Sequence, residues 1–99
     1  MTTRDWSVLV ELDATDVSDD THDDMLTALS DHAANTTTAG NGNFAVILSV
    51  SAVGPVEAAQ IAVDLVLAVA PTELHGHQAV GVEVVTEAEL ERRATTAAH

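Results

Sequence analysis

The chain has 99 residues, which suits a single domain, and its 16 acidic residues face three arginines and no lysine, giving a formal net charge of −13. A field of this sign repels phosphate groups, so direct binding to DNA, RNA or an anionic membrane is disfavoured. It favours either solubility or a basic protein partner. The absence of cysteine excludes disulfides, thiolate zinc sites and a thiol nucleophile, and the absence of lysine excludes Schiff-base chemistry.

The first predicted element is a strand over residues 6–14, with the sequence WSVLVELDA. Apolar side chains recur there at every second position, the period of a strand with one buried face. A helix is predicted next, over residues 15–35, with Ser18 as its N-cap. The side chains expected on its buried face are Val17, Met25, Leu26, Leu29 and Ala33.

Residues 35–52 predict a β-hairpin, in which a weak polar strand, the turn dipeptide Asn41-Gly42 and a strongly apolar strand follow one another. The side chains sharing one face of the apolar strand are Phe44, Val46, Leu48, Val50 and Ala52. A second helix is predicted over residues 54–71, because Pro55 stands at its start and Pro71 at its end. Its expected buried side consists of Val56, Ala59, Val63, Val66, Leu67 and Ala70.

A last strand is predicted over residues 79–85, with the sequence AVGVEVV. Thr86 and Glu89 then form a capping-box pattern, which predicts a short C-terminal helix. We therefore expect a single domain over residues 1–94 and a flexible tail over residues 95–99.

The order of elements, β-α-β-β-α-β, is the split βαβ arrangement of ferredoxin-like domains. It predicts an α+β fold with a four-stranded antiparallel sheet and two helices on one of its faces. The first and third strands are the most apolar and are expected at the centre of the sheet, whereas the polar second strand suits an edge.

The chain also resembles uncharacterised small acidic ferredoxin-like proteins of high-GC bacteria. Two stretches carry this resemblance, WSVLVELDA near the start and VGVEVVTEAELERR near the end. Both are structural motifs, so the resemblance implies a fold and no activity.

The acidic stretch 16–25, DVSDDTHDDM, raises the question of a cation site. As a calcium loop it fails, because the glycine and terminal glutamate positions of such a loop hold threonine, aspartate or serine in either register. Two aspartates suit the first helical turn, but the two that follow stack like charges one turn later. These later acids are either generic solvated residues, as a GC-rich genome or a high-salt cytoplasm would produce, or part of an acidic docking face. That docking face would comprise Asp20, Asp23, Asp24 and Asp31.

Three residues near the last strand are weak candidates for a metal site. His75 and His77 flank a glycine and point the same way if the segment is extended, and Glu73 is close in sequence. A loop with two exposed histidines is the commoner interpretation. No motif predicts a catalytic residue or a cofactor site, and we expect the protein not to be an enzyme.

The sheet face opposite the helices forms a second candidate surface. The side chains expected to point inward from the sheet are Trp6, Val8, Val10, Val46, Leu48, Val50, Val80, Val82 and Val84. Leu9, Ala45, Ile47 and Val85 would then form an aliphatic strip on the open face, suited to a homodimer contact. The alternative is that Leu90 folds back and covers this strip within one chain.

The sequence contains no signal-peptide pattern, and its longest apolar stretch is too short to cross a bilayer. We therefore expect a cytoplasmic, non-enzymatic interaction or regulatory module that acts through the open sheet face, the acidic first helix, or both. One alternative is a dimeric domain that binds a small ligand. The other is an acidic inhibitor that imitates nucleic acid and occupies a basic protein.

Overall fold

The computed structural model describes residues 2–86, 88, 89 and 92. The chain adopts an α+β fold with one four-stranded antiparallel sheet, whose strand order is β2-β3-β1-β4. The strands are β1 (Arg4–Thr15), β2 (Asn35–Thr38), β3 (Asn43–Ala52) and β4 (Ala79–Thr86). The strands at the centre are thus the two long apolar ones, β1 and β3, and the polar β2 lies at an edge.

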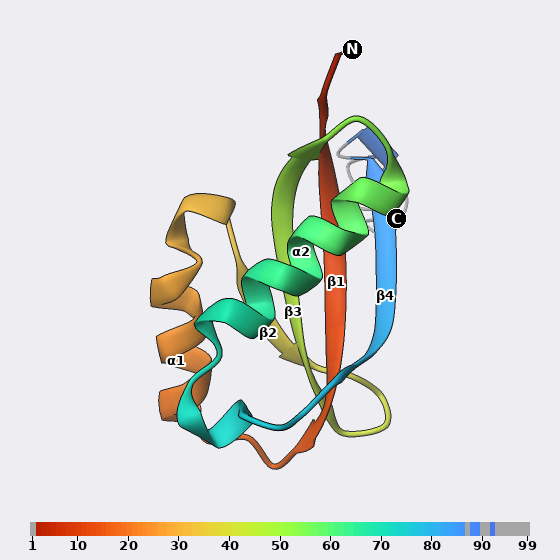
Figure 1. The fold of residues 1–99 in the computed structure, drawn as a ribbon. Helices are drawn as coiled ribbons and strands as arrows, with labels where there is room; N and C mark the ends of the chain where they lie inside the picture. The colour runs from red at the N-terminus through yellow and green to blue at the C-terminus, as the bar shows by residue number, and fades with distance from the viewer. Residues whose placement is uncertain (1, 87, 90–91, 93–99) are drawn as a thin grey trace.

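Two α-helices pack on the sheet, α1 (Asp19–Ala28) and α2 (Pro55–Val69). Helix α2 crosses the sheet diagonally in front of β3, β1 and β4, and α1 lies beside β2 (Figure 1). Each is followed by one short 3₁₀ turn, η1 (Ser30–His32) and η2 (Thr72–Leu74). Within the described residues, the helices are too short or too polar to cross a bilayer.

The core forms as the alternating apolar pattern predicts. The inward side chains of β1 and β3 are buried in one cluster with Met25 of α1, its C-cap Leu29 and Val66 of α2, so both helices cover the same face of the sheet. Trp6 closes one end of this cluster, and its indole Nε1 donates a hydrogen bond to the carbonyl of Ala52 at 3.0 Å. The predicted buried positions of the two central strands are confirmed, because the inward side chains Trp6, Val8, Val10, Val46, Leu48 and Val50 are all buried.

The predicted buried side of α2 is wrong in part: Val66 is buried as expected and Val63 and Ala70 pack against the core, but the helix is rotated relative to the prediction. Ala58, Ala62 and Val66 face the core, whereas Val56 is 83% exposed and Leu67 is 43% exposed. The sequence of α2 is apolar almost all round, so no broad polar stripe fixes which side turns inward. The two small alanines fit against the sheet and leave larger aliphatic side chains on the flanks.

The prediction for β4 is also wrong in part. Val82 and Val84 pair with Val10 and Val8 in register, so they share the helix side of the sheet. Only Val84 packs against the core, because Val80 and Val82 are 56% and 42% exposed. Helix α2 therefore leaves the first half of this edge strand uncovered.

Helix α1 is shorter than the pattern indicates. It ends at Ala28, the chain continues as η1, and Ala33 is exposed in a left-handed conformation with φ of 51°. This turn redirects the chain into β2, and neither a glycine nor a proline marks it in the sequence. The predicted burial of Ala33 is therefore wrong, while Met25 and Leu29 are buried as expected.

The hairpin between β2 and β3 forms around the predicted glycine, in a longer loop than the dipeptide suggests. The backbone N–H of Gly42 donates to the carbonyl of Ala39, and Gly42 follows this turn with φ of 91°. After β4, the backbone N–H of Glu89 donates to Oγ1 of Thr86 at 3.0 Å, which is the predicted capping bond. The tail 95–99 and Leu90 lie outside the described residues.

Candidate functional site: the acidic loop end

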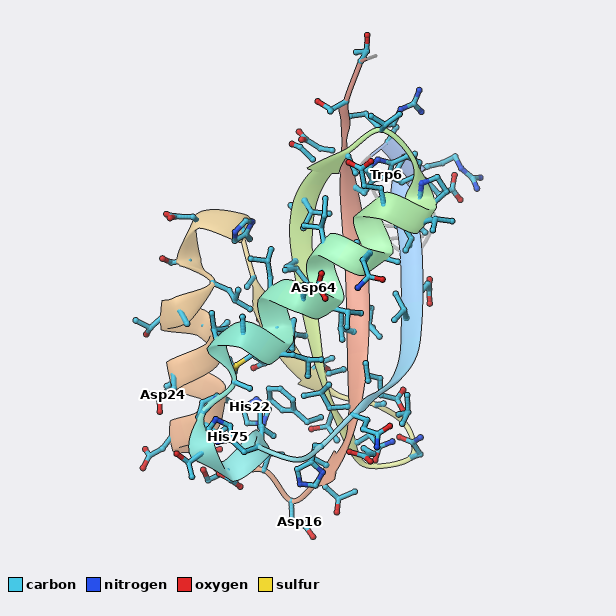
Figure 2. The ribbon with its side chains drawn as sticks, viewed as in Figure 1. Trp6, Asp16, His22, Asp24, Asp64 and His75 are labelled. Atoms are coloured by element: carbon cyan, nitrogen blue, oxygen red, sulfur yellow. The ribbon has the colours of Figure 1, made fainter. Side chains whose placement is uncertain are left out.

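Three connections meet at one end of the molecule: residues 16–18 before α1, residues 39–42 between β2 and β3, and residues 70–78 between α2 and β4 (Figure 1). We call this region the loop end. Figure 2 shows Asp16 and His22 at this end and Trp6 at the opposite end. Most of the informative polar contacts of the chain are found here.

The first of these contacts caps helix α1. The hydroxyl of Ser18 accepts a hydrogen bond from the backbone N–H of Thr21, as its predicted role as N-cap requires. The carboxylate of Glu73 accepts bonds from the Ser18 hydroxyl at 2.6 Å and from the Ser18 backbone N–H at 3.1 Å. It also accepts a bond from the hydroxyl of Thr21.

In a capping box the residue three positions after the N-cap is a glutamate that binds the N-cap backbone N–H. That position holds Thr21 in α1, and Glu73 of η2 supplies the missing carboxylate from a distant part of the chain. These donors, led by the Ser18 hydroxyl, hold the pKa of Glu73 below its usual range. Glu73 is therefore a structural cap that joins the α2–β4 connection to α1.

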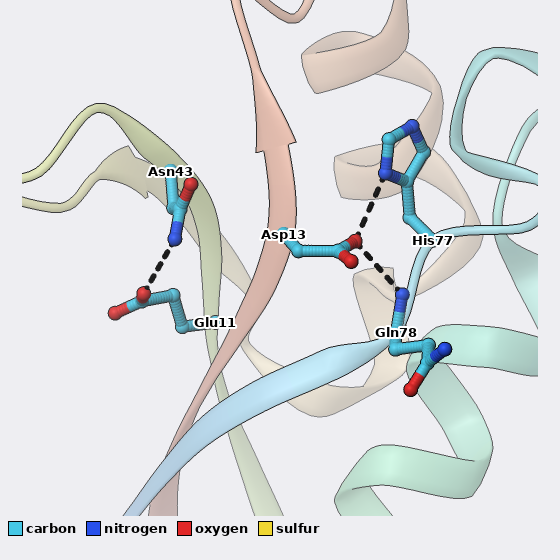
Figure 3. A network of polar contacts seen from close by, with 5 residues as sticks. All are labelled: Glu11, Asp13, Asn43, His77 and Gln78. Atoms are coloured by element: carbon cyan, nitrogen blue, oxygen red, sulfur yellow. Dashed lines mark hydrogen bonds and ion pairs between the residues drawn. The ribbon is translucent and has the colours of Figure 1, made fainter.

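A second carboxylate anchors the entry to β4. Oδ1 of Asp13 accepts hydrogen bonds from the backbone N–H of Gln78 and from Nδ1 of His77, each at 2.9 Å (Figure 3). The bond from Gln78 and then that from His77 lower the pKa of Asp13. The ends of the central strand β1 and the edge strand β4 are thereby joined beyond their regular pairing.

A third carboxylate holds the β2–β3 hairpin. Oε2 of Glu11 accepts a hydrogen bond from the side-chain amide of Asn43 at 2.8 Å (Figure 3). It accepts a second bond from the side-chain amide of Asn41 at 3.2 Å. These amides lower the pKa of Glu11, with Asn43 contributing most. The loop end is thus stabilised by three acids, each of which has a specific partner.

The structure separates the three weak metal candidates. Glu73 caps α1, His77 binds Asp13, and Nε2 of His75 donates to the carbonyl of Ala70 at 3.0 Å. Across residues 2–86, 88, 89 and 92, no three histidine, aspartate or glutamate side chains are grouped in a way that could hold a metal ion. Each candidate instead stabilises the connection in which it lies.

A pocket of about 190 Å³ opens at the loop end, and no sequence motif indicated it. Its walls combine two apolar side chains with an acid, an imidazole, a hydroxyl and a backbone turn. The residues that line it are Asp16, Val17, His22, Thr38, Gly42 and Phe44. They come from four different segments of the chain, so only the fold brings them together.

His22 is held in a fixed orientation in this pocket. Its Nδ1 lies 2.7 Å from Oγ1 of Thr36, and its ring meets the ring of Phe44 edge to face at 4.7 Å between centroids. A hydroxyl beside an imidazole resembles a nucleophile and its base, but that arrangement needs a third group to orient the imidazole. Among the described residues, no carboxylate hydrogen-bonds His22.

The outer surface of α1 carries acids of a different kind. Asp19, Asp20, Asp23 and Asp24 are all exposed, and Asp24 points away from the molecule in Figure 2. In the described part of the chain none of these four carboxylates accepts a hydrogen bond or forms an ion pair. We call these four residues the α1 acidic face. Asp31, predicted to belong to the same docking face, is exposed in η1, beyond the end of the helix.

The strip predicted for the open sheet face is present but is less exposed than expected. Leu9 and Ile47 face each other across β1 and β3, and both are half-buried, as is Val85. Ala45 is fully buried between its register partners Glu11 and Thr37. The large aliphatic side chains that are exposed lie elsewhere, mainly on α2 and at the start of β4.

No protein-family model, no curated protein and no solved structure matches this chain. The function must therefore be argued from the loop end, the α1 acidic face and the edge of the sheet.

Proposed function

We propose that the protein is a small non-catalytic interaction module with a ferredoxin-like fold, which docks onto a basic protein partner through the α1 acidic face. The strand order β2-β3-β1-β4 and the antiparallel pairing of all neighbouring strands support the ferredoxin-like assignment. This fold hosts many unrelated functions, so the docking role rests on the surface alone.

The observation that carries the proposal is the contrast between two groups of acids. Glu11, Asp13 and Glu73 have hydrogen-bond partners that stabilise the fold. The four acids of the α1 acidic face have none among the described residues, and their i, i+4 spacing places like charges one turn apart. Each such pair costs about 0.2–0.5 kcal/mol. A basic partner would offset this repulsion, and a partner that normally binds nucleic acid is one class that fits.

Binding of an oligolysine peptide to two matched triple variants tests this proposal. The first variant, Asp20→Asn with Asp23→Asn and Asp24→Asn, removes three charges from the α1 acidic face. The second removes three charges from other exposed sites, Asp5→Asn with Glu57→Gln and Asp64→Asn. Both variants have the same net charge, so long-range attraction is matched.

We expect the first variant to bind the peptide about tenfold more weakly than the second at low salt, and the difference to shrink at high salt. Equal affinities of the two variants would show that only the net charge attracts the peptide. In that case the acids of α1 reflect genome composition or salt adaptation, and the proposal fails.

Self-association is a second candidate function, favoured by the exposed edge of β4. This strand has eight residues and contains neither lysine nor proline, and among the described residues it pairs with β1 alone, along its other edge. A long apolar edge strand that lacks lysine and proline exposes unpaired backbone N–H and C=O groups, to which another strand can hydrogen-bond. The second edge, β2, has only four residues and a polar sequence, so it is a poorer template.

A two-fold axis at Val82 would produce a self-complementary antiparallel pair. Val82 would face Val82 of the second copy, Val80 would face Val84, and Glu83 would lie opposite Gly81 rather than opposite another acid. This arrangement uses the exposed side chains of β4 rather than the half-buried strip around Leu9. A dimer of this kind would also create a cleft between copies, where the alternative of a small-ligand site would be located.

Light scattering on a sizing column at low and high salt measures this association. Val82→Lys should give a monomer, whereas Val56→Lys, the same change at an exposed site on α2, should leave the dimer intact. A dimer that survives Val82→Lys but is lost in Leu9→Asp would assign the contact to the open sheet face. A monomer at both salts in the unmodified protein would remove self-association as a function.

A further inference from the structure

The pocket at the loop end is a concave site that is distinct from the exposed acids around it. We infer that it receives the cationic end of a single lysine or arginine side chain presented by the partner, an inference that rests on the docking function proposed above. The pocket would thus serve as the anchor site of the interface, next to the first turn of α1.

The size of the pocket suits the end group of one side chain better than a whole small molecule. Its volume of about 190 Å³ is below the range of roughly 300–1,000 Å³ that is typical of small-molecule sites. One buried anchor of a partner, projecting into a cavity at the edge of a charged surface, is a common way for a small interface to gain specificity.

The chemistry of the walls selects for a cation. Asp16 lies at the exposed rim of the pocket, and its carboxylate has no hydrogen-bond partner within the described chain, so it remains available for a charge-assisted bond. Thr38 adds a hydroxyl that accepts a hydrogen bond. Phe44 and Val17 provide apolar walls, which can contact the aliphatic part of a lysine or arginine side chain.

His22 completes the acceptor set. When the proton resides on Nδ1, that nitrogen donates to Oγ1 of Thr36 at 2.7 Å, and Nε2 keeps a lone pair that accepts a hydrogen bond. Nε2 of His22 has no partner among the described residues. The edge-to-face contact with Phe44 holds the imidazole in place before a ligand arrives.

The backbone of the pocket rim is also preorganised. Asp16 adopts φ of 54°, a left-handed conformation that aspartate tolerates better than most residues. Two residues later, the contact between Ser18 and Glu73 fixes the start of α1 and hence the loop that carries Asp16 and Val17. An anchor site held in this way loses little entropy on binding.

The surrounding charges point to the same ligand class. Asp19, Asp20 and Glu73 lie close to Asp16 along the chain or through the cap. The basic side chains that the structure describes are Arg4, which stacks over Trp6 at the opposite end, and Arg92, which pairs with Glu89. The negative potential at the loop end would therefore repel an anionic group and attract a cation.

NMR titration with two capped amino acids tests the inference directly. N-acetyl-arginine amide carries the cation, and N-acetyl-citrulline amide has nearly the same shape without the charge. We expect the arginine compound to shift the backbone amides of Val17, His22 and Gly42 in a saturable manner at millimolar concentrations. The citrulline compound should leave these amides unchanged.

Asp16→Asn is the informative variant, because asparagine also favours the left-handed conformation and only the charge is lost. It should weaken arginine binding about tenfold, whereas Asp64→Asn, which changes the net charge equally on α2, should have no such effect. Equal effects of the two variants, equal shifts with the citrulline compound, or shifts spread over all exposed acids would overturn the inference.

The two proposals fail in different ways. If the triple variant of the α1 acidic face weakens oligolysine binding while Asp16→Asn leaves both oligolysine and arginine binding unchanged, the docking face stands and the anchor pocket does not. If neither set of changes affects oligolysine binding beyond the matched controls, the docking function itself is wrong and the anchor falls with it.

Discussion

Glu73 and Ser18 are separated by 55 residues in the sequence, yet the Glu73 carboxylate binds both the hydroxyl and the backbone N–H of Ser18. The start of helix α1 is therefore stabilised by the α2–β4 connection as well as by its own N-cap. The first turn of α1 and the connection before β4 form one unit, and changes on either side are expected to affect the other.

The coupling of these two residues can be measured by a double-mutant cycle. Ser18→Ala removes the N-cap and should lower the free energy of unfolding by about 1 kcal/mol. Glu73→Gln removes the charge while it keeps the shape. Because the residues are in direct contact, the double variant should lose less stability than the sum of the single variants in urea unfolding. Additive losses would mean that the contact contributes nothing to the fold.

Acid should destabilise the protein through Glu73, Asp13 and Glu11. Hydrogen bonds lower the pKa of each of these acids in the folded state, so the unfolded chain binds protons more readily as the pH falls. Their contribution is complete above the unfolded-state pKa values near 4 and is lost as the pH falls through the folded-state values.

Urea unfolding at a series of pH values tests this effect. The variant Glu73→Gln should show a smaller loss of stability between neutral and acid pH than the unmodified protein. An exposed acid without a partner, changed by Asp24→Asn, provides the control. Parallel pH profiles for all three proteins would show that the acids of the loop end do not stabilise the fold.

Ala33 offers a stabilising substitution. It occupies a left-handed conformation with φ of 51°, which costs an alanine about 1–2 kcal/mol and costs glycine almost nothing. Ala33→Gly should therefore raise the midpoint of thermal unfolding, even though glycine increases the entropy of the unfolded chain. Ala68→Gly, inside α2, should lower the midpoint by the usual cost of glycine in a helix. A lowered midpoint for Ala33→Gly would contradict the left-handed turn.

The α1 acidic face should cost stability in the free protein. Neutralising Asp23 and Asp24 removes both like-charge pairs at i, i+4 and keeps the favourable first-turn charges of Asp19 and Asp20, so this double variant should be more stable at low salt by roughly 0.4–1 kcal/mol. Added sodium chloride screens the same repulsion and should reduce the difference. A double variant that is less stable than the unmodified protein would show that Asp23 and Asp24 help to start the helix.

Much of the fold followed from local patterns. The period of two in β1 and β3 identified the central strands and their buried faces, and Pro55 and Pro71 bounded α2 to within two residues. The rotation of α2 could not be predicted, because apolar residues surround the helix and only its packing on the sheet selects Ala58 and Ala62. The left-handed turn at Ala33 lacks the glycine that normally marks such a position.

The candidate site was harder to predict than the fold. Ser18 was identified as a cap from local sequence, but its partner Glu73 is distant in sequence and was considered as a metal ligand instead. The pocket joins Asp16, His22 and Phe44, whose proximity depends on the placement of α1 against the hairpin. Spacing along a chain carries no information about such contacts unless the fold is known first.

The excess of acids at the loop end, opposite Arg4 and Trp6, would also affect the rate at which the protein meets a basic partner. Arg4 lies beside Trp6, whereas Asp16 and the first turn of α1 occupy the opposite end (Figure 2). This separation gives the molecule an electric dipole, which turns the loop end toward a positively charged surface before contact. The productive orientation would then be reached in a larger fraction of collisions, and dilute salt would change the association rate constant more than the lifetime of the complex.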